Sequence, residues 1–286
     1  MRFRDKIKKP QRPVVTYEIL PPREKDGTLN SYAEKISSLL SQTHIDAINI
    51  PEVREEEGRG KRPVVNSSRA EPRHFGRLLQ DMVGVESIVN RVVVHDELKN
   101  QIKWFRETHE KYEIENMIIV GGESSKIKYI GPTVNQILEL VAFKYNNDRG
   151  DILCGGITLP TRSDESKNLI RKSGNGAEFF TTQVLCDSEN IIKMMNKYQE
   201  RCDALNTFPR RILLSFAPIS SEKNIQFLKW LGVEISKDTE KYLFGRPGSM
   251  TERSLDVAIE VFNQIIKNII KNNLKIPIGL NVEHIM

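Results

Sequence analysis

Short apolar runs of strand length alternate with segments of helical periodicity along the 286-residue chain, and this alternation restricts the possible folds most strongly. The run 211–216 is rich in apolar residues and has the length of a buried strand. Segment 29–40 instead carries apolar residues at helical spacing. We predict eight strands: 14–20, 45–50, 91–94, 117–120, 152–157, 179–185, 211–216 and 276–282. Strands separated by helices predict a parallel sheet.

Eight strand and helix units in a chain of this length indicate the α/β class and predict a single-domain (β/α)8 TIM barrel, with a doubly wound sheet as the alternative. The last predicted strand ends four residues before the end of the sequence, so we expect the eighth outer helix to be missing. The basic N-terminal segment, a second copy of the chain in a homo-oligomer, or another partner would then cover the last strand.

The formal net charge of +5 raises the question of a nucleic-acid partner, and its location answers that question. Residues 1–12 hold six basic residues and one acidic residue, whereas residues 13–286 hold 37 of each sign. We therefore predict a basic N-terminal extension at 1–12 and a charge-balanced TIM-barrel catalytic domain at 13–286. No nucleic acid is expected as a partner.

Cysteine and histidine spacing argues against a metal centre and against a disulfide framework. Cys154, Cys186 and Cys202 are few and widely separated, and the five histidines show no HxxxH spacing. No stretch approaches the roughly 20 apolar residues that span a bilayer. We expect a cytoplasmic protein with no bound metal and no membrane partner.

Glu18 is the candidate catalytic residue because it interrupts an otherwise apolar first strand. The ends of the strands build the active site of a TIM barrel, and an apolar setting raises the pKa of a carboxylic acid. A carboxyl group that stays protonated near neutral pH is a proton donor. The alternative is that Glu18 faces outward or forms a structural ion pair.

Two further strand ends carry candidate binding residues. Gly121 and Gly122 follow the fourth strand, where backbone N–H groups could approach a flat or anionic ligand, although paired glycines are also typical of a tight turn. Gln183 interrupts the sixth strand and offers an amide that could pair with a heterocycle. The alternative for Gln183 is a polar edge position in a threonine-rich strand.

Several motifs together resemble those of the methylenetetrahydrofolate reductase family. Segment 17–23, YEILPPR, is similar to the first-strand E-x-x-P-P signature of that family. Segment 169–189 resembles its lysine-containing helix, turn and T-Q strand, and segments 216–220 and 279–282 fall where the family has a P-x-x-S turn and a last L-N strand. The resemblance covers most of the chain and identifies it as a divergent short member.

The resemblance implies an oxidoreductase that reduces 5,10-methylenetetrahydrofolate, or a related one-carbon pterin, to the 5-methyl form. NADH or NADPH would supply the hydride, and FAD would carry it. By position, Glu18 is the general acid, Glu123 and Gln183 bind the folate-type substrate, and Lys172 lies on the flavin phosphate side. Glu165 takes the place of a residue at the flavin ribityl chain, and Gly121 and Gly122 stand in the flavin-binding R-G-D motif.

The departures from the family pattern fall on the flavin side. The R-G-D motif is Gly121-Gly122-Glu123 here, Glu165 replaces an aspartate, and the histidine position of strand three is Arg91 unless His95 substitutes for it. Weak flavin binding, or hydride transfer directly from nicotinamide to folate, would follow. Two other functions stay open: a folate-dependent C1 or methyl transferase, and a non-catalytic folate-binding partner subunit.

Overall fold

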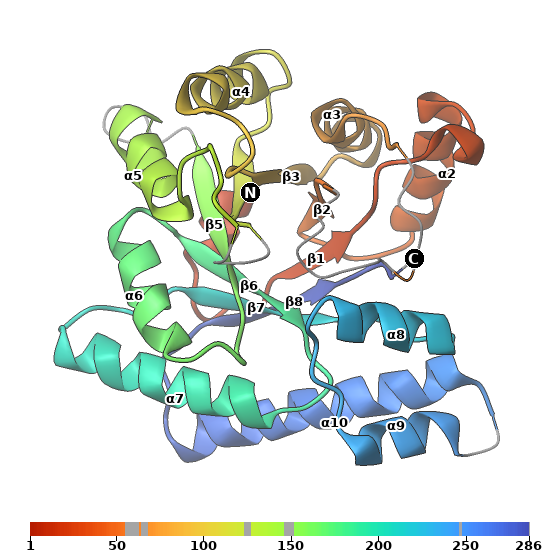
Figure 1. Ribbon diagram of the computed structural model, residues 1–286, viewed down its shortest axis with the longest axis vertical. Coiled ribbons are helices and arrows are strands. Elements are labelled where there is room, and N and C mark those ends of the chain that lie inside the picture. The colour runs from red at the N-terminus through yellow and green to blue at the C-terminus, as the bar shows by residue number, and fades with distance from the viewer. Residues whose placement is uncertain (55–62, 64–67, 123–126, 146–151, 246–247, 286) are drawn as a thin grey trace.

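Eight parallel strands close into a barrel in the order in which they occur along the chain (Figure 1). The computed structural model describes residues 1–54, 63, 68–122, 127–145, 152–245 and 248–285. The strands are β1 (Val15–Glu18), β2 (Ala47–Ile50), β3 (Glu86–Val92), β4 (Asn116–Val120), β5 (Leu153–Thr158), β6 (Phe179–Val184), β7 (Arg211–Phe216) and β8 (Ile278–Val282). The predicted (β/α)8 TIM barrel is confirmed. The alternative of a doubly wound sheet is wrong, because β8 pairs with β1.

All helices but the first surround the barrel and connect successive strands (Figure 1). They are α1 (Phe3–Ile7), α2 (Leu29–Leu40), α3 (Pro72–Val83), α4 (Leu98–Glu110), α5 (Val134–Tyr145), α6 (Glu165–Gly174), α7 (Glu189–Ala204), α8 (Glu222–Trp230), α9 (Lys237–Phe244) and α10 (Met250–Lys271), with a 3₁₀ turn, η1 (Glu24–Asp26). The bounds of α2 match the prediction because Thr28 caps its first turn and the apolar spacing ends at Leu40.

The third strand begins earlier than its apolar run predicts. We expected it at 91–94, but β3 already starts at Glu86. Polar side chains interrupt the apolar pattern in this part of the strand. A tertiary contact explains how one of them can be buried. The hydroxyl of Ser87 donates to the carbonyl of Gly76 on α3, and both residues are buried.

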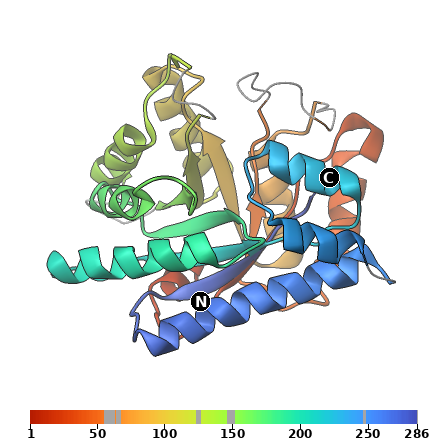
Figure 2. The same cartoon turned by 60° about the horizontal axis from the view of Figure 1, so that its bottom comes forward.

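The N-terminal segment closes the bottom of the barrel (Figure 2). Phe3 and Ile7 of α1 are buried against the lower barrel interior, and the ring of Phe3 meets that of Phe179 edge to face at 5.9 Å. Arg211, at the start of β7, is 1% exposed and donates hydrogen bonds to the carbonyl oxygens of Ile7, Lys9 and Ile278. A buried guanidinium thus holds the basic segment to the barrel floor.

This placement corrects the expectation that the N-terminal segment covers the last strand. The segment lies under the barrel, and the outward side chains of β8 pack instead against α10. Ile278 and Leu280 contact the cluster that contains Val261 and Ile265, yet both remain partly exposed. Residues 283–285 form no helix. Cover by a second copy or another partner stays a prediction.

The barrel interior changes from apolar to polar along the strands. Its lower layer includes Val14, Ala47, Ile88, Phe179 and Leu213. Inward positions recur at every second residue of a strand. Two residues further along these five strands the side chains are all polar: Thr16, Asn49, Asn90, Thr181 and Ser215. The polar upper half lies at the C-terminal ends of the strands, where TIM barrels place their active sites.

Candidate active site

Glu18 lies at the C-terminal end of β1, two residues beyond the inward-facing Thr16. Its carboxylate oxygen Oε2 accepts a hydrogen bond from the side-chain nitrogen of Asn49 on β2 over 3.1 Å. Burial of the carboxyl raises the pKa of Glu18 well above its usual value, and the neighbouring Glu283 raises it further. The chain therefore holds a carboxylic acid at the polar end of the barrel.

Glu283 directly follows β8 and is the second carboxyl of the site. The amide nitrogen of Asn281 donates to its Oε1 over 3.2 Å, and its own backbone N–H donates to the carbonyl of Phe216 over 2.8 Å. Burial raises the pKa of Glu283 to about 7, although hydrogen bonds with Ser215 and Asn281 oppose the shift.

A chain of side-chain hydrogen bonds supports these carboxyls from below. The hydroxyl of Thr16 donates to Oδ1 of Asn281 over 2.7 Å, and the nitrogen of the same amide contacts Ser215 at 3.1 Å. The hydroxyls of Ser215 and Thr181 lie 3.3 Å apart. All four residues are buried, so this network fixes the orientation of Asn281 toward Glu283.

Two buried amides keep an unpaired acceptor oxygen in this region. Oδ1 of Asn49 and Oδ1 of Asn90 have no hydrogen-bond partner, and the two residues are 2% and 7% exposed. A buried acceptor without a partner costs about 1–3 kcal/mol. Both residues occupy inward positions of neighbouring strands, so a ligand rich in N–H donors would satisfy them.

Gln183, at the end of β6, lies apart from this hydrogen-bonded cluster. Its side-chain nitrogen donates to the carbonyl of Leu231, just after α8, over 2.7 Å. It lines a small hollow with Pro160 and Asn190. In the described part of the chain no hydrogen bond connects Gln183 with Glu18.

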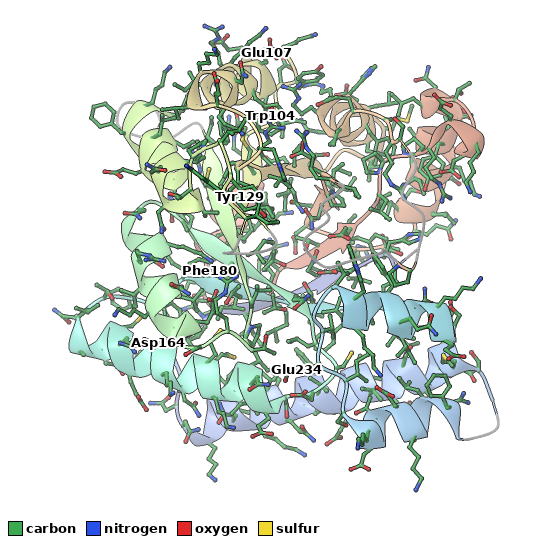
Figure 3. The ribbon with its side chains drawn as sticks, viewed as in Figure 1. Trp104, Glu107, Tyr129, Asp164, Phe180 and Glu234 are labelled. Atoms are coloured by element: carbon green, nitrogen blue, oxygen red, sulfur yellow. The ribbon has the colours of Figure 1, made fainter. Side chains whose placement is uncertain are left out.

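Gly121 and Gly122 end β4, and a side chain of the protein itself occupies the space that Gly122 leaves. A Cβ atom at Gly122 would lie 2.2 Å from the ring of Tyr129. Tyr129 lies inside the ring of outer helices (Figure 3) and stacks edge to face on His95 at 5.4 Å. The glycine thus makes room for a tyrosine. Glu123, the predicted pterin-binding residue, lies outside the described residues.

Glu165 and Lys172 come together as a buried ion pair between α6 and β5. Nζ of Lys172 donates to the carbonyl of Ile157 over 2.6 Å and lies 3.5 Å from Oε1 of Glu165. Oε2 of Glu165 accepts a hydrogen bond from Asn168 over 2.8 Å and lies 3.5 Å from Arg162. Burial lowers the pKa of Lys172 while Glu165 opposes the shift. The alkyl chain of Lys172 packs near Gly156, on the outer side of the strand.

Three of the four residues predicted to hold the flavin, Gly122, Glu165 and Lys172, do not fit that role as they are arranged. The ring of Tyr129 covers Gly122, and the ammonium of Lys172 is already bonded to a carbonyl and a carboxylate. A flavin phosphate would compete with both contacts of Lys172, and this residue is only 8% exposed. Flavin binding therefore stays a prediction that these residues do not favour.

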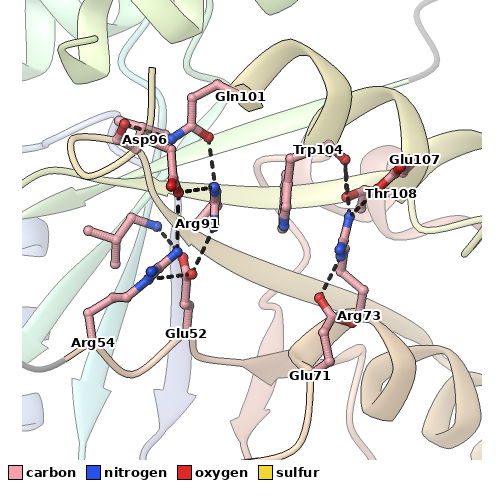
Figure 4. Close-up of polar contacts among 12 residues, drawn as sticks. Glu52, Arg54, Glu71, Arg73, Arg91, Asp96, Gln101, Trp104, Glu107 and Thr108 are labelled. Carbon is pink, nitrogen blue, oxygen red and sulfur yellow. Dashed lines mark hydrogen bonds and ion pairs between the residues drawn. The ribbon is translucent and has the colours of Figure 1, made fainter. Parts of the chain in front are cut away.

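Arg91, at the position where the family has a histidine, belongs to a structural ion network beside the barrel (Figure 4). Its guanidinium contacts Glu52 at 2.8 Å, Asp96 at 2.6 Å and Gln101 at 2.9 Å. It also lies 4.9 Å from the ring centroid of Trp104. Since every side of this guanidinium is engaged, Arg91 positions the segments after β2 and β3.

Metal-ligand clusters and membrane-length helices are absent from the ranges that the structure describes. There, no group of three or more histidine, cysteine or acidic side chains is arranged to hold a metal ion. In the same ranges no helix has the length and apolarity needed to cross a membrane. All three cysteines are buried and free.

A comparison with models of protein families gives a match over nearly the whole chain, and the fold and the carboxyls at the barrel end agree with it. A family model for methylenetetrahydrofolate reductase matches residues 2–278. The chain belongs to the methylenetetrahydrofolate reductase family. No curated protein matches this family member significantly.

One solved structure supports the fold of this methylenetetrahydrofolate reductase family member. An uncharacterized protein from Clostridium thermocellum that binds two copies of 5-methyl-5,6,7,8-tetrahydrofolic acid superposes with a TM-score of 0.79 and 20% identity, covering 98% of this chain and 92% of its own. A 2,3-dimethylmalate lyase is more distant, with a TM-score of 0.46, 12% identity and coverage of 96% and 86%. Oxaloacetate acetylhydrolase superposes with a TM-score of 0.48 and 12% identity, covering 92% of this chain and 95% of its own.

Sequence reasoning missed part of the site. Glu283, Asn281 and Asn49 contact each other or Glu18, but none was predicted as a site residue. A usable signal was present, because Asn49 interrupts the apolar run 45–50 near its end as Glu18 interrupts the first strand. Glu283 had no such signal, because it lies after the strand and reaches the site only through closure of the barrel.

Proposed function

We propose that this protein binds a one-carbon tetrahydrofolate at the polar end of its barrel and reduces the 5,10-methylene form to the 5-methyl form with NADH or NADPH. The observation that carries the proposal is the Glu18 carboxyl, which points to the C-terminal end of the barrel and has a pKa raised by burial. Family membership and the relative that binds 5-methyltetrahydrofolic acid support the choice of substrate.

Glu18 acts as the proton donor in this proposal. Its proton passes to the N10 nitrogen of the five-membered ring, and the electron pair of the bond between N10 and the methylene carbon moves to N10. The methylene carbon is left as an iminium on N5. A reduced nicotinamide supplies the hydride that converts this carbon to a methyl group. Glu18 then needs one proton from water to complete the cycle.

Asn49 and Asn90 provide recognition in the same proposal. The pterin ring carries N–H and NH₂ donors, and each amide holds a buried acceptor oxygen without a partner. Pairing them with the ligand would remove the free-energy penalty of about 1–3 kcal/mol that each unpaired acceptor carries. A ligand without these donors would leave them unpaired and bind less tightly.

Direct hydride transfer between nicotinamide and folate is part of the proposal. It is supported by the internal contacts of Gly122, Glu165 and Lys172, which leave these residues without a free group for flavin. A cytoplasmic location is proposed as well, since three free, buried cysteines suit a reducing compartment.

The test is an anaerobic assay of the purified full chain that follows oxidation of NADH or NADPH at 340 nm with 5,10-methylenetetrahydrofolate. We expect nicotinamide oxidation that depends on folate, with 5-methyltetrahydrofolate formed in equal amount. In Glu18→Gln we expect the rate to be at least 100-fold lower. Glu222→Gln, at the start of α8, is the control variant. Tight folate binding without turnover, or methyl transfer without nicotinamide oxidation, would contradict a reductase.

A further inference from the structure

The two carboxyls of the site are neighbours across the seam that closes the barrel. Tyr17 of β1 pairs with Val282 of β8, so Glu18 and Glu283, the residues that directly follow this pair, are at the same level. Neighbouring strands lie about 4.8 Å apart. Glu283 also has an inward-facing partner, since Asn281 reaches its Oε1 from within the barrel.

Nothing in the described part of the chain neutralises both carboxyls. No salt bridge reaches Glu18 or Glu283 there, and their described side-chain contacts are with Asn49, Asn281 and Ser215. Among the described residues, His284 directly follows Glu283, Arg69 lies near His284, and Glu52 follows β2, the other neighbour of β1. Arg69 donates to the carbonyl of Pro21, and Glu52 pairs with Arg54 and Arg91. Arg69 and burial both lower the pKa of His284, which favours its neutral form.

Two adjacent, partly buried carboxyls to which no described cation pairs cannot both ionise cheaply, because each negative charge disfavours the other. Sharing one proton between them is the arrangement of lower free energy. Asn49 donates to Glu18 and Asn281 donates to Glu283, so each group has a hydrogen bond that can stabilise a negative charge.

We propose that Glu283 is a positioning residue that keeps Glu18 protonated by sharing one proton with it across the β1–β8 seam. This inference rests on the proposed function for its catalytic meaning, whereas the shared proton itself is a property of the unliganded protein. In turnover, Glu18 gives its proton to N10 and both carboxyls are briefly negative. One proton from water then restores the singly protonated pair.

The decisive measurement is a carboxyl titration of the unliganded full chain labelled with [δ-¹³C]glutamate. Resonances of the pair are assigned by their absence in Glu18→Gln and Glu283→Gln. In the unmodified protein we expect the two signals to move together in two coupled steps. In Glu283→Gln we expect Glu18 to titrate at least about one pH unit lower, which is a tenfold smaller protonated fraction on the alkaline side.

Three variants make the outcome specific. Glu283→Asp keeps the negative charge and should retain the coupled steps. Glu178→Gln removes a carboxyl that pairs with Arg210 at the opposite end of the barrel, and should leave the titration of Glu18 unchanged. An unchanged titration of Glu18 in Glu283→Gln, when circular dichroism shows a folded protein, would overturn the inference.

Activity separates this inference from the proposed function. If the assay shows reduction, Glu283→Gln should shift the alkaline fall of kcat to lower pH by the same amount as the titration, with KM little changed at low pH. A coupled titration without reductase activity would refute the function and keep the shared proton. A kcat fall at the same pH as in the unmodified protein would refute the catalytic role of Glu283.

Discussion

The side-chain nitrogen of Asn49 lies 3.1 Å from Oε2 of Glu18 and donates a hydrogen bond to it. The two residues are paired in register on adjacent strands, so the barrel itself sets this contact. An amide donor stabilises a carboxylate more than a neutral acid, and Asn49 therefore opposes the effect of burial and of Glu283 on Glu18.

Replacing this donor should raise the pH at which Glu18 titrates. We expect Asn49→Leu to move the titration upward by about one unit, since a hydrogen bond to a charged group contributes about 1.5–3 kcal/mol. Carboxyl-labelled NMR measures the shift. Asn90→Leu is the matched control, because Asn90 is also an inward-facing buried amide but has no hydrogen bond to Glu18. A downward shift of the titration in Asn49→Leu would show that Asn49 does not stabilise the ionised form of Glu18.

Stability should fall as pH rises toward neutrality, because of the same carboxyls. The folded protein binds a proton at Glu283 with a pKa of about 7, against the ordinary 4.5 of the unfolded chain. The stability that this proton contributes is complete below about pH 4.5 and is lost as pH rises to about 7. The free energy of unfolding is measured with urea at pH 5 and at pH 8. Between these two pH values, the free energy of unfolding of Glu283→Gln should fall by about 2 kcal/mol less than that of the unmodified protein.

That comparison has a clear contrary result. Other carboxyls titrate in the same range, so only the difference between the two proteins is informative. Equal losses of free energy of unfolding in both proteins would mean that Glu283 titrates near its ordinary pKa in the folded state.

The purified protein should lack stoichiometric flavin. Because Tyr129 fills the space beside Gly122 and Lys172 is bonded to Ile157 and Glu165, we expect no flavin absorption in the supernatant after heat denaturation. Adding FAD to the purified protein should give no shift of its visible spectrum at micromolar concentration. A yellow protein that bleaches with NADH or NADPH would show that these side chains rearrange.

The floor of the barrel should depend on Phe3. Its ring is 1% exposed and contacts Phe179, so Phe3→Ala should lower the free energy of unfolding by about 3 kcal/mol. Phe208→Ala is the control, because Phe208 is 86% exposed and its loss should change the stability by less than about 0.5 kcal/mol. Urea unfolding compares both at pH 7. Equal small effects would mean that α1 adds little to the core.

The regular alternation of strand and helix patterns along the sequence made the barrel predictable. The elements that were missed depend on individual tertiary contacts or are too short to show a pattern. The strand at 211–216 and the helix at 29–40 have the predicted bounds because their apolar spacing coincides with their burial. The first half of β3 was missed, since Ser87 and Asn90 are polar residues that are nevertheless buried, and Ser87 is bonded to Gly76 on α3. Helix α1 was missed because five residues carry too little periodicity to stand out.

The site was predictable only where a polar residue interrupts a strand. Glu18 could be selected in this way, and its environment has the predicted effect on its pKa. The partner Glu283 could not, because β8 and β1 are separated by nearly the whole chain and meet only when the barrel closes. The engagement of Lys172 with Ile157 and Glu165 was equally hidden, as it depends on how α6 packs on β5.

Closure of the barrel floor by Phe3, Ile7 and Arg211 leaves the C-terminal end as the route to the carboxyl pair. Ligand and protons then share one entrance. A folate seated above Glu18 and Glu283 would separate them from bulk water until it leaves, so the spent proton would be replaced only between turnovers. The order of events would follow from the architecture: product release first, reprotonation second, and new substrate third.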